Sequence, residues 1–131
     1  MNTKKMTLTV NFNTTPAQLY SDWLSSEGHT NITGGEANAS MELGAPFTAW
    51  DGYIEGVNLE LETNKRILQS WRTMEFNAED EDSEIEILLK AEKEGVKFTL
   101  IHSNIPVGAI EKYKQGWEEH YIAPMLQYYN N

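Results

Sequence analysis

The sequence predicts an α+β fold in which an antiparallel sheet curves around one long C-terminal helix. Several segments alternate apolar and polar residues with the period of two that is typical of strands. A helix-start signal follows the first of these segments. The last segment, from residue 110 onward, repeats apolar residues every three or four positions, as an amphipathic helix does. Strands and helices in this order pack as layers around one core.

The size and charge of the chain indicate one acidic domain, residues 1–131. Twenty acidic and ten basic residues give a net charge of -10. This charge repels phosphate backbones and anionic headgroups, so we expect no nucleic-acid partner and no membrane partner. The chain has no cysteine, no run of about 18 apolar residues and no apolar region after its N-terminal lysines. We therefore expect a cytoplasmic protein.

The N-terminal segment predicts a strand followed by a helix. Residues 6–12 alternate, which predicts a half-buried strand whose apolar face consists of Met6, Leu8, Val10 and Phe12. Thr15 suits the N-cap of the helix, Pro16 its first turn and Gln18 the capping-box position. We expect Gly28 to end this helix.

The middle of the chain predicts a hairpin. Residues 29–44 lose periodicity, which predicts a short helical turn and then a weak edge strand near residues 37–41. A short strand at residues 47–50 precedes a longer one, on which we expect one face to hold Tyr53, Val57, Leu59 and Leu61 and the other Ile54, Gly56, Asn58 and Glu60. Asn64 tolerates the left-handed conformation of a tight turn, so residues 67–71 pair back antiparallel.

A second hairpin follows a polar excursion at residues 75–86. The pattern predicts one strand with Ile85, Ile87, Leu89 and Ala91 on a single face, and another with Phe98, Leu100 and His102. Gly95 provides the positive φ for the connection, and Pro106 ends the second strand because it cannot donate a ladder hydrogen bond.

The last segment predicts a long amphipathic helix with a largely aromatic stripe. The stripe consists of Ile110, Tyr113, Trp117, Tyr121 and Met125. Pro124 removes one internal hydrogen bond and is expected to kink the helix near its end.

Several short stretches, in their order and spacing, carry a family resemblance. They are Ile32-Thr33-Gly34-Gly35-Glu36-Ala37, Phe47 with Asp51-Gly52 and Ile54-Glu55-Gly56, Ile67 to Trp71-Arg72, and Gly116-Trp117 with Tyr121 and Pro124. Together they resemble the C-terminal domain of the family named for the activator of the heat shock protein 90 ATPase, within the START-like helix-grip (SRPBCC) superfamily. The resemblance implies a helix-grip fold. The eukaryotic co-chaperone of that family carries a further N-terminal domain, for which 131 residues leave no room.

A sheet that grips one helix leaves space for a cavity between the two, and we name the residues that would line it. They are Trp23, Phe47, Tyr53, Leu59, Trp71, Phe98, Leu100, His102, Tyr113, Trp117 and Tyr121. Apolar pockets with a few polar anchors are typical of small-molecule sites. Plain core packing is the commoner use of such side chains and stays the alternative for most of them.

Polar residues in the sequence give no catalytic or metal motif. His29, His102 and His120 lack the spacing of zinc ligands, so we expect no metal, no cofactor and no catalytic residue. His102 alternates with the apolar residues of its strand and could anchor a ligand, together with Arg72 or Asn58. The acidic run at residues 79–82 reads as a solvated loop or as a patch that docks on a basic partner.

Two functional hypotheses follow. The first is a non-enzymatic, single-domain member of the resembled family that modulates a chaperone ATPase or acts as a stress-related interaction protein. The second is a carrier or sensor that binds a small hydrophobic ligand between the sheet and the C-terminal helix. A START-like enzyme stays open as a third reading, because such folds also host catalysis in their cavities.

Overall fold

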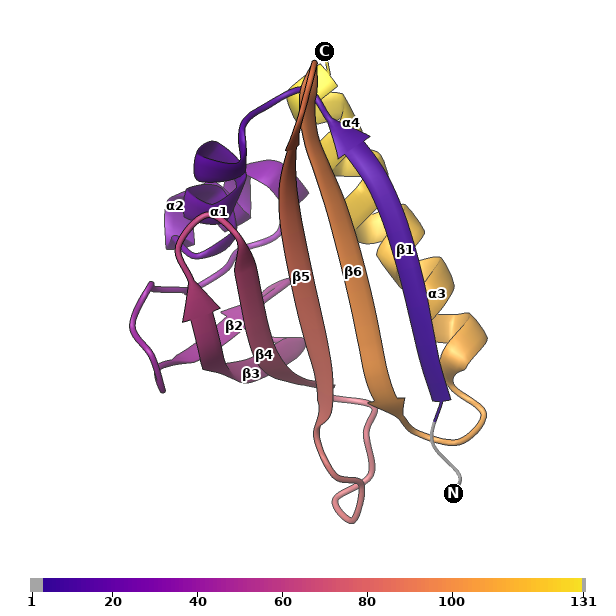
Figure 1. Cartoon of the computed structure of the whole chain (residues 1–131). Helices are drawn as coiled ribbons and strands as arrows, with labels where there is room; N and C mark the ends of the chain where they lie inside the picture. The colour runs from indigo at the N-terminus through magenta and orange to yellow at the C-terminus, as the bar shows by residue number, and fades with distance from the viewer. Residues whose placement is uncertain (1–3, 131) are drawn as a thin grey trace.

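Six antiparallel strands form one curved sheet that wraps around the C-terminal helix in the computed structural model, which describes residues 4–130 (Figure 1). The helices α1 and α2 lie together beside the opposite part of the sheet. The elements are β1 Lys4–Phe12, α1 Pro16–Trp23, α2 Ser26–Thr33, β2 Pro46–Ala49, β3 Ile54–Glu62, β4 Arg66–Thr73, β5 Ser83–Glu92, β6 Gly95–Ile105, α3 Ile110–Trp117, the π-helical turn η1 Glu118–Ile122 and α4 Ala123–Asn130. This arrangement is the helix-grip fold that the sequence predicts.

The strand order is β1-β6-β5-β4-β3-β2. Strands β2 to β6 follow one another as hairpins, whereas β1 pairs with β6 at the far edge. Asn64 at the β3–β4 turn has a φ of 63°, and Gly95, the first residue of β6 after the β5–β6 turn, has a φ of 147°, as the sequence predicts for these turns. Strand β6 ends at Ile105, directly before Pro106.

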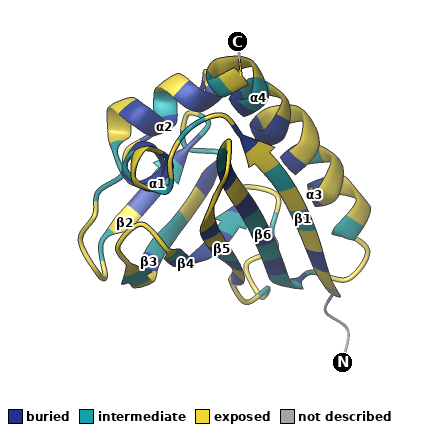
Figure 2. Ribbon diagram, turned by 45° about the horizontal axis from the view of Figure 1, so that its top comes forward, coloured by how far each residue is buried: buried dark blue, intermediate teal, exposed yellow. Residues whose placement is uncertain are grey.

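The core lies between the concave face of the sheet and the C-terminal helix, and buried residues line this side of both elements (Figure 2). Strand β5 buries Ile85, Ile87 and Leu89, and β6 buries Phe98, Leu100 and His102, as predicted, although Ala91 is exposed. The helix buries Tyr113, Trp117, Tyr121 and Met125. Aromatic rings make direct contacts across this core; the centroids of Trp71 and Trp117, for example, lie 5.4 Å apart.

Gly28 does not end the first helix. Helix α1 stops at Trp23, and Gly28 lies in the first turn of α2, where its backbone nitrogen donates to the Ser25 hydroxyl at 3.0 Å. A Cβ at Gly28 would lie 2.5 Å from the Cα of Asp22. Glycine is therefore present because the end of α1 and the start of α2 approach closely, and the sequence prediction for this position is wrong.

The predicted edge strand near residues 37–41 is reduced to one isolated bridge between Asn38 and Thr48. On β3 the expectation that Leu59 faces the cavity is wrong: Asn58 is 1% exposed, while Leu59 is 38% exposed beside a shift of the β3–β4 register. The side-chain amide of Asn58 donates to the carbonyl oxygens of Ser40 and Glu42, both at 2.9 Å. These bonds allow a polar residue to occupy the buried position.

The C-terminal helix contains a π-helical turn, η1, that ends two residues before Pro124, and the kink expected at the proline stays a prediction. In this turn the Ala123 nitrogen donates to the Glu118 carbonyl, one residue farther back than in an α-helix. The described residues contain no helix that combines the length and apolar character needed to span a membrane.

Candidate functional site

A buried polar chain joins the C-terminal helix to the sheet and fixes the orientation of Trp117. The indole nitrogen of Trp117 donates to Nδ1 of His102 at 3.0 Å, so Nε2 of that ring carries the proton. His102 Nε2 lies 2.8 Å from the hydroxyl of Ser83, which donates in turn to the Trp71 carbonyl at 2.6 Å. Each member of the chain has a partner when His102 is neutral. Burial agrees with this state, because it lowers the pKa of His102 to about 3.

A second buried histidine holds Tyr121 in place. His29 Nδ1 donates to the carbonyl of Trp23 at 2.9 Å, which leaves Nε2 to accept from the Tyr121 hydroxyl at 2.8 Å. Burial lowers the pKa of His29 to about 4, against a smaller opposing effect of the Trp23 carbonyl. Two neutral histidines therefore set the positions of two aromatic side chains on the C-terminal helix.

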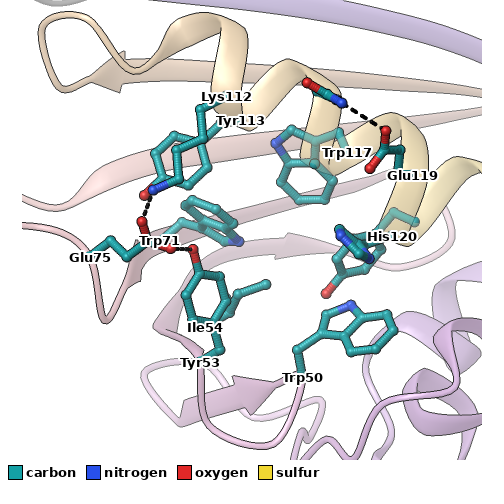
Figure 3. Close-up of a pocket in the computed structure, with 13 residues that line it drawn as sticks. Trp50, Tyr53, Ile54, Trp71, Glu75, Lys112, Tyr113, Trp117, Glu119 and His120 are labelled. Carbon is teal, nitrogen blue, oxygen red and sulfur yellow. Dashed lines mark hydrogen bonds and ion pairs between the residues drawn. The ribbon is translucent and has the colours of Figure 1, made fainter.

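Next to these anchored side chains lies an open cleft of about 610 Å³ between the C-terminal helix and the β2–β4 part of the sheet (Figure 3). Its walls are largely aromatic. The lining residues are Trp50, Tyr53, Ile54, Trp71, Glu75, Lys112, Tyr113, Gln115, Gly116, Trp117, Glu119, His120 and Tyr121. A Cβ at Gly116 would meet no atom within 4 Å, so the helix leaves room here.

One end of the cleft carries an internally paired polar group. The Glu75 carboxylate accepts from the Tyr53 hydroxyl at 2.5 Å and pairs with the ammonium group of Lys112. Beside it, the Tyr113 hydroxyl lies 2.7 Å from that of Thr73. The charged groups at this end neutralise each other and leave the aromatic walls as the dominant surface.

Trp50 forms the other end of the cleft and sits in an unusual turn between β2 and β3. Trp50 and Asp51 have φ values of 50° and 60°, in the left-handed region that non-glycine residues seldom adopt. Asp51 secures the turn: its backbone nitrogen donates to the Glu36 carbonyl at 2.9 Å, and its carboxylate accepts from the Glu36 nitrogen at 3.1 Å. A Cβ at Gly35 would lie 2.4 Å from the Trp50 ring, so glycine is required for the indole to pack there.

The structure brings five of the predicted cavity residues together in the cleft: Tyr53, Trp71, Tyr113, Trp117 and Tyr121. Five others are buried without lining it: Trp23, Phe47, Phe98, Leu100 and His102. Leu59 is a correction, since it is 38% exposed on β3 and does not line the cleft. Its strand turns Asn58 inward instead, so the alternation places Leu59 on the outer side.

The proposed polar anchors also lie outside the cleft. Both ring nitrogens of His102 are used within the core, and Asn58 bonds to Gln69 and to loop carbonyls. Arg72 instead holds the acidic loop after β4, through Asp82 at 2.7 Å and the carbonyls of Asp80 and Asn77. Arg72, one of the three proposed polar anchors, thus fastens the loop to the sheet.

Several cleft residues are missed by the periodic pattern. Trp50 follows the short strand β2 and belongs to a turn, so the alternation gives it no direction; the Asp51-Gly52 turn and the Gly34-Gly35 pair are the signals that could have identified it. Lys112 and His120 are exposed residues of the C-terminal helix. They line the cleft because the sheet lies opposite them, and the helical pattern alone does not indicate this. Within the described residues, no three histidine, aspartate or glutamate side chains are grouped as metal ligands would be.

Comparison with known proteins gives a consistent result. The family model described as Activator of Hsp90 ATPase homolog 1-like protein matches residues 13–129. The chain is 24% identical over 121 residues to the activator of 90 kDa heat shock protein ATPase homolog of Dictyostelium discoideum, covering 92% of this chain and 31% of that protein. It is 29% identical over 115 residues to homolog 2 of Mus musculus, covering 88% and 34%.

The chain therefore spans about a third of the length of these curated relatives. Among solved structures, the crystal structure of an HSP90 activator from Plasmodium falciparum has a TM-score of 0.82 to this chain, with 22% identity and 91% of each chain covered. That likeness shows a common fold.

Proposed function

The chain belongs to the family of Activator of Hsp90 ATPase homolog 1-like proteins, and on this premise we propose that it is a non-enzymatic binding protein that takes a small, largely apolar ligand in the cleft. The single observation that carries the proposal is the open, aromatic-walled space of about 610 Å³ beside Trp117. Ligand pockets of about 300–1,000 Å³ with mostly apolar walls and a few polar groups are typical of small-molecule sites.

The state of the polar groups supports binding rather than catalysis. Glu75 is neutralised by Lys112, and Glu119 accepts from the Gln115 amide at 2.8 Å. The two histidines with pKa values lowered to about 3 and about 4 spend both ring nitrogens on hydrogen bonds inside the core. A general base needs a free nitrogen or oxygen within reach of a substrate proton, and these two buried histidines provide none.

Filling the cleft without disturbing the fold tests this proposal. Gly116→Leu adds a side chain where a Cβ meets open space, and leucine is a better helix former than glycine. We expect the wild-type protein to bind the neutral fluorescent probe N-phenyl-1-naphthylamine saturably, and Gly116→Leu to bind it at least tenfold more weakly with an unchanged or higher melting temperature. Lys114→Leu, on an exposed position of α3 outside the cleft, is the matched control.

The contrary results are specific. Saturable binding that is equal in the wild type and in Gly116→Leu would place the probe elsewhere, and an absence of saturable binding to the wild type would remove the proposal. Loss of binding in Lys114→Leu as well would point to a general effect on the helix.

A second function, modulation of a chaperone ATPase through surface contacts, is supported by the family and by the acidic loop that Arg72 holds against the sheet. Glu79 and Glu81 on this loop are exposed, and neither binds Arg72. If the loop docks on a chaperone, adding the protein should change the rate of ATP hydrolysis by Hsp90, and Glu79→Lys with Glu81→Lys should abolish the change. Glu94→Lys on the β5–β6 hairpin is the control, and an unchanged rate across a full titration would refute this function.

A further inference from the structure

We infer that the ligand of the cleft carries a positively charged head, a quaternary ammonium group, which lies against the rings of Trp50 and Tyr53. This inference rests on the proposed function and deepens it, because it adds one charged group to the largely apolar ligand. Three features of the cleft support it: two rings presented by one turn, a lysine whose charge is already taken, and a carboxylate that keeps its charge.

The first feature is the turn between β2 and β3, which presents two aromatic rings to the same space. Trp50 and Tyr53 both line the cleft and are half-buried, so part of each residue stays open to a ligand. The indole nitrogen of Trp50 is covered, so this ring offers its carbon atoms. Trp71 and Trp117 are only 4% and 3% exposed and offer less surface. Figure 3 shows the rings of Trp50 and Tyr53 across the cleft from Trp117.

The turn holds these two rings in a fixed relation. The Tyr53 nitrogen donates to the Trp50 carbonyl at 3.1 Å, and the Tyr53 hydroxyl donates to Glu75 at 2.5 Å. Asp51 bonds twice to Glu36, which maintains the left-handed φ values of 50° and 60° at Trp50 and Asp51. Strained residues that are held in this way cluster at ligand sites. The rings are therefore in place before a ligand enters, which lowers the entropic cost of binding.

A quaternary ammonium group suits such rings. Its charge is attracted to the electron-rich faces of tryptophan and tyrosine within about 6 Å of the ring centre. It has no N–H group, so it requires no hydrogen-bond acceptor from the cleft. This property matters because the Glu75 carboxylate already accepts from Tyr53 and pairs with Lys112. The apolar body of the ligand then extends along the remaining aromatic wall, as the proposed function requires.

The charges along the cleft favour a cation over an anion. Lys112 is the one lysine or arginine among the lining residues, and it is paired with Glu75. Glu119 also lines the cleft, and it accepts from the neutral amide of Gln115 at 2.8 Å, which leaves its negative charge in place. The whole chain carries a net charge of -10. An anionic ligand would have to displace Glu75 from Lys112 against this field, whereas the field attracts a cation.

Two probes of the same shape separate the charge of the ligand from its apolar contacts. (2-Naphthylmethyl)trimethylammonium has a positively charged nitrogen where 2-neopentylnaphthalene has a carbon atom. Each is titrated in competition with the dye N-phenyl-1-naphthylamine at low ionic strength, where charges are least screened. We expect the wild-type protein to bind the cation at least about fivefold more tightly than the alkyl probe, although the alkyl probe is the more hydrophobic of the two.

The outcomes distinguish this inference from the proposed function. A cation that displaces the dye no better than the alkyl probe, or not at all, would overturn the charged head and leave the cleft as a binding site. If the dye itself does not bind saturably to the wild type, the proposed function and this inference fall together.

Matched variants then assign the preference to the cleft. Glu119→Gln removes a lining carboxylate, and Glu118→Gln removes one from the neighbouring exposed position outside the cleft, with the same change in net charge. Only Glu119→Gln should lower the ratio of the two affinities, by about threefold. Tyr53→Leu removes one ring and should bring the two affinities to within about twofold of each other. Equal ratios in the two glutamine variants, or a full preference kept in Tyr53→Leu, would contradict the inference.

An NMR measurement on the wild type does not depend on the folding of a variant. The N-methyl protons of the bound cation should show nuclear Overhauser contacts to ring protons of Trp50 and Tyr53, and ring currents should move the N-methyl resonance upfield. Contacts of these methyl protons to other residues only, under conditions in which the cation displaces the dye, would place the charged head elsewhere and refute its position on these rings.

Discussion

Trp117 on the C-terminal helix donates its indole proton to Nδ1 of His102 on β6, across 3.0 Å. This contact fixes the direction of every hydrogen bond in the buried chain. Because Nδ1 of His102 accepts from Trp117, Nε2 carries the ring proton and donates to the Ser83 hydroxyl. The Ser83 hydroxyl then donates to the Trp71 carbonyl. Protonation of His102 would put a proton on Nδ1, opposite the donor of Trp117, and break the chain at the wall of the cleft.

Acid should destabilise the protein through its two buried histidines. Folding lowers the pKa of His29 to about 4 and that of His102 to about 3, from an ordinary value near 6.5. The unfolded chain therefore takes up these protons first as the pH falls. Their contribution to stability is complete above about pH 6.5 and is lost as the pH falls to about 4 for His29 and to about 3 for His102, at about 1.4 kcal/mol per pH unit for each. Urea unfolding at several pH values measures this slope.

His29→Gln and His102→Gln test the origin of the slope, because each removes one titrating ring and keeps an amide that can donate and accept. Each variant should reduce the pH dependence between about pH 6 and pH 4. Ile87→Val is the control, since it weakens the core without removing a titrating group and should lower the stability equally at every pH. Slopes that do not change in either glutamine variant would assign the acid sensitivity to the carboxylates.

Two glycines in helices should respond in opposite ways to alanine. Gly116 in α3 has open space around its missing Cβ, so Gly116→Ala should stabilise the protein by about 0.5–1 kcal/mol through helix propensity. A Cβ added at Gly28 in α2 would lie only 2.5 Å from the Cα of Asp22. Gly28→Ala should therefore destabilise the protein by about 2 kcal/mol or more. Chemical denaturation of both variants checks the two signs; a loss of stability at Gly116 would mean that the helix lies closer to the sheet.

The buried Gln69 should be costly to remove. Its amide accepts from Trp23 Nε1 at 3.1 Å and donates to Asn58 at 2.8 Å. Gln69→Leu leaves Nε1 of Trp23 and Oδ1 of Asn58 unpaired in the core, and we expect a loss of about 2–4 kcal/mol in the free energy of unfolding. Gln127→Leu, on an exposed position of α4, should change stability by less than about 0.5 kcal/mol. Similar small effects for both would show that solvent reaches Gln69.

Arg72 should control the mobility of the acidic loop. It contacts Asn77, Asp80 and Asp82, and its guanidinium lies 5.2 Å from the centre of the Phe76 ring. Lysine cannot reproduce this planar set of donors. Arg72→Lys should therefore open the loop and increase cleavage by a glutamate-specific protease after Glu79 or Glu81. Lys112→Arg is a suitable control, and a cleavage rate equal to that of the wild type would mean that the loop is held by other contacts.

The strands and the closing helix are predictable from the sequence because one face of each is buried against a common core. At Ile85, Ile87 and Leu89 the apolar residue marks the inward face directly. The same reasoning fails on β3, where Asn58 takes the inward position by bonding to carbonyls 16 and 18 residues earlier in the chain. A local pattern contains no information about such long-range partners.

The candidate site is less predictable than the fold. Periodicity selects Tyr113, Trp117 and Tyr121, because they share one face of the helix. It does not separate the aromatic residues that face the open cleft from those packed in the core, since that depends on how far the sheet lies from the helix at each point. Trp50 belongs to a left-handed turn, where neither the strand period nor the helix period applies.

The pairing of β1 with β6 has a consequence for synthesis on the ribosome. Val10 pairs with Phe98, so the apolar side of the first strand is translated long before its neighbour exists. At about 5–20 residues per second, this interval lasts roughly 5 to 20 seconds. During that time the hairpins of β2 to β5 can form from nearby residues, while the nascent β1 segment remains an unpaired, half-apolar ribbon. A segment of this kind is prone to associate with other chains until its partner strand has been made.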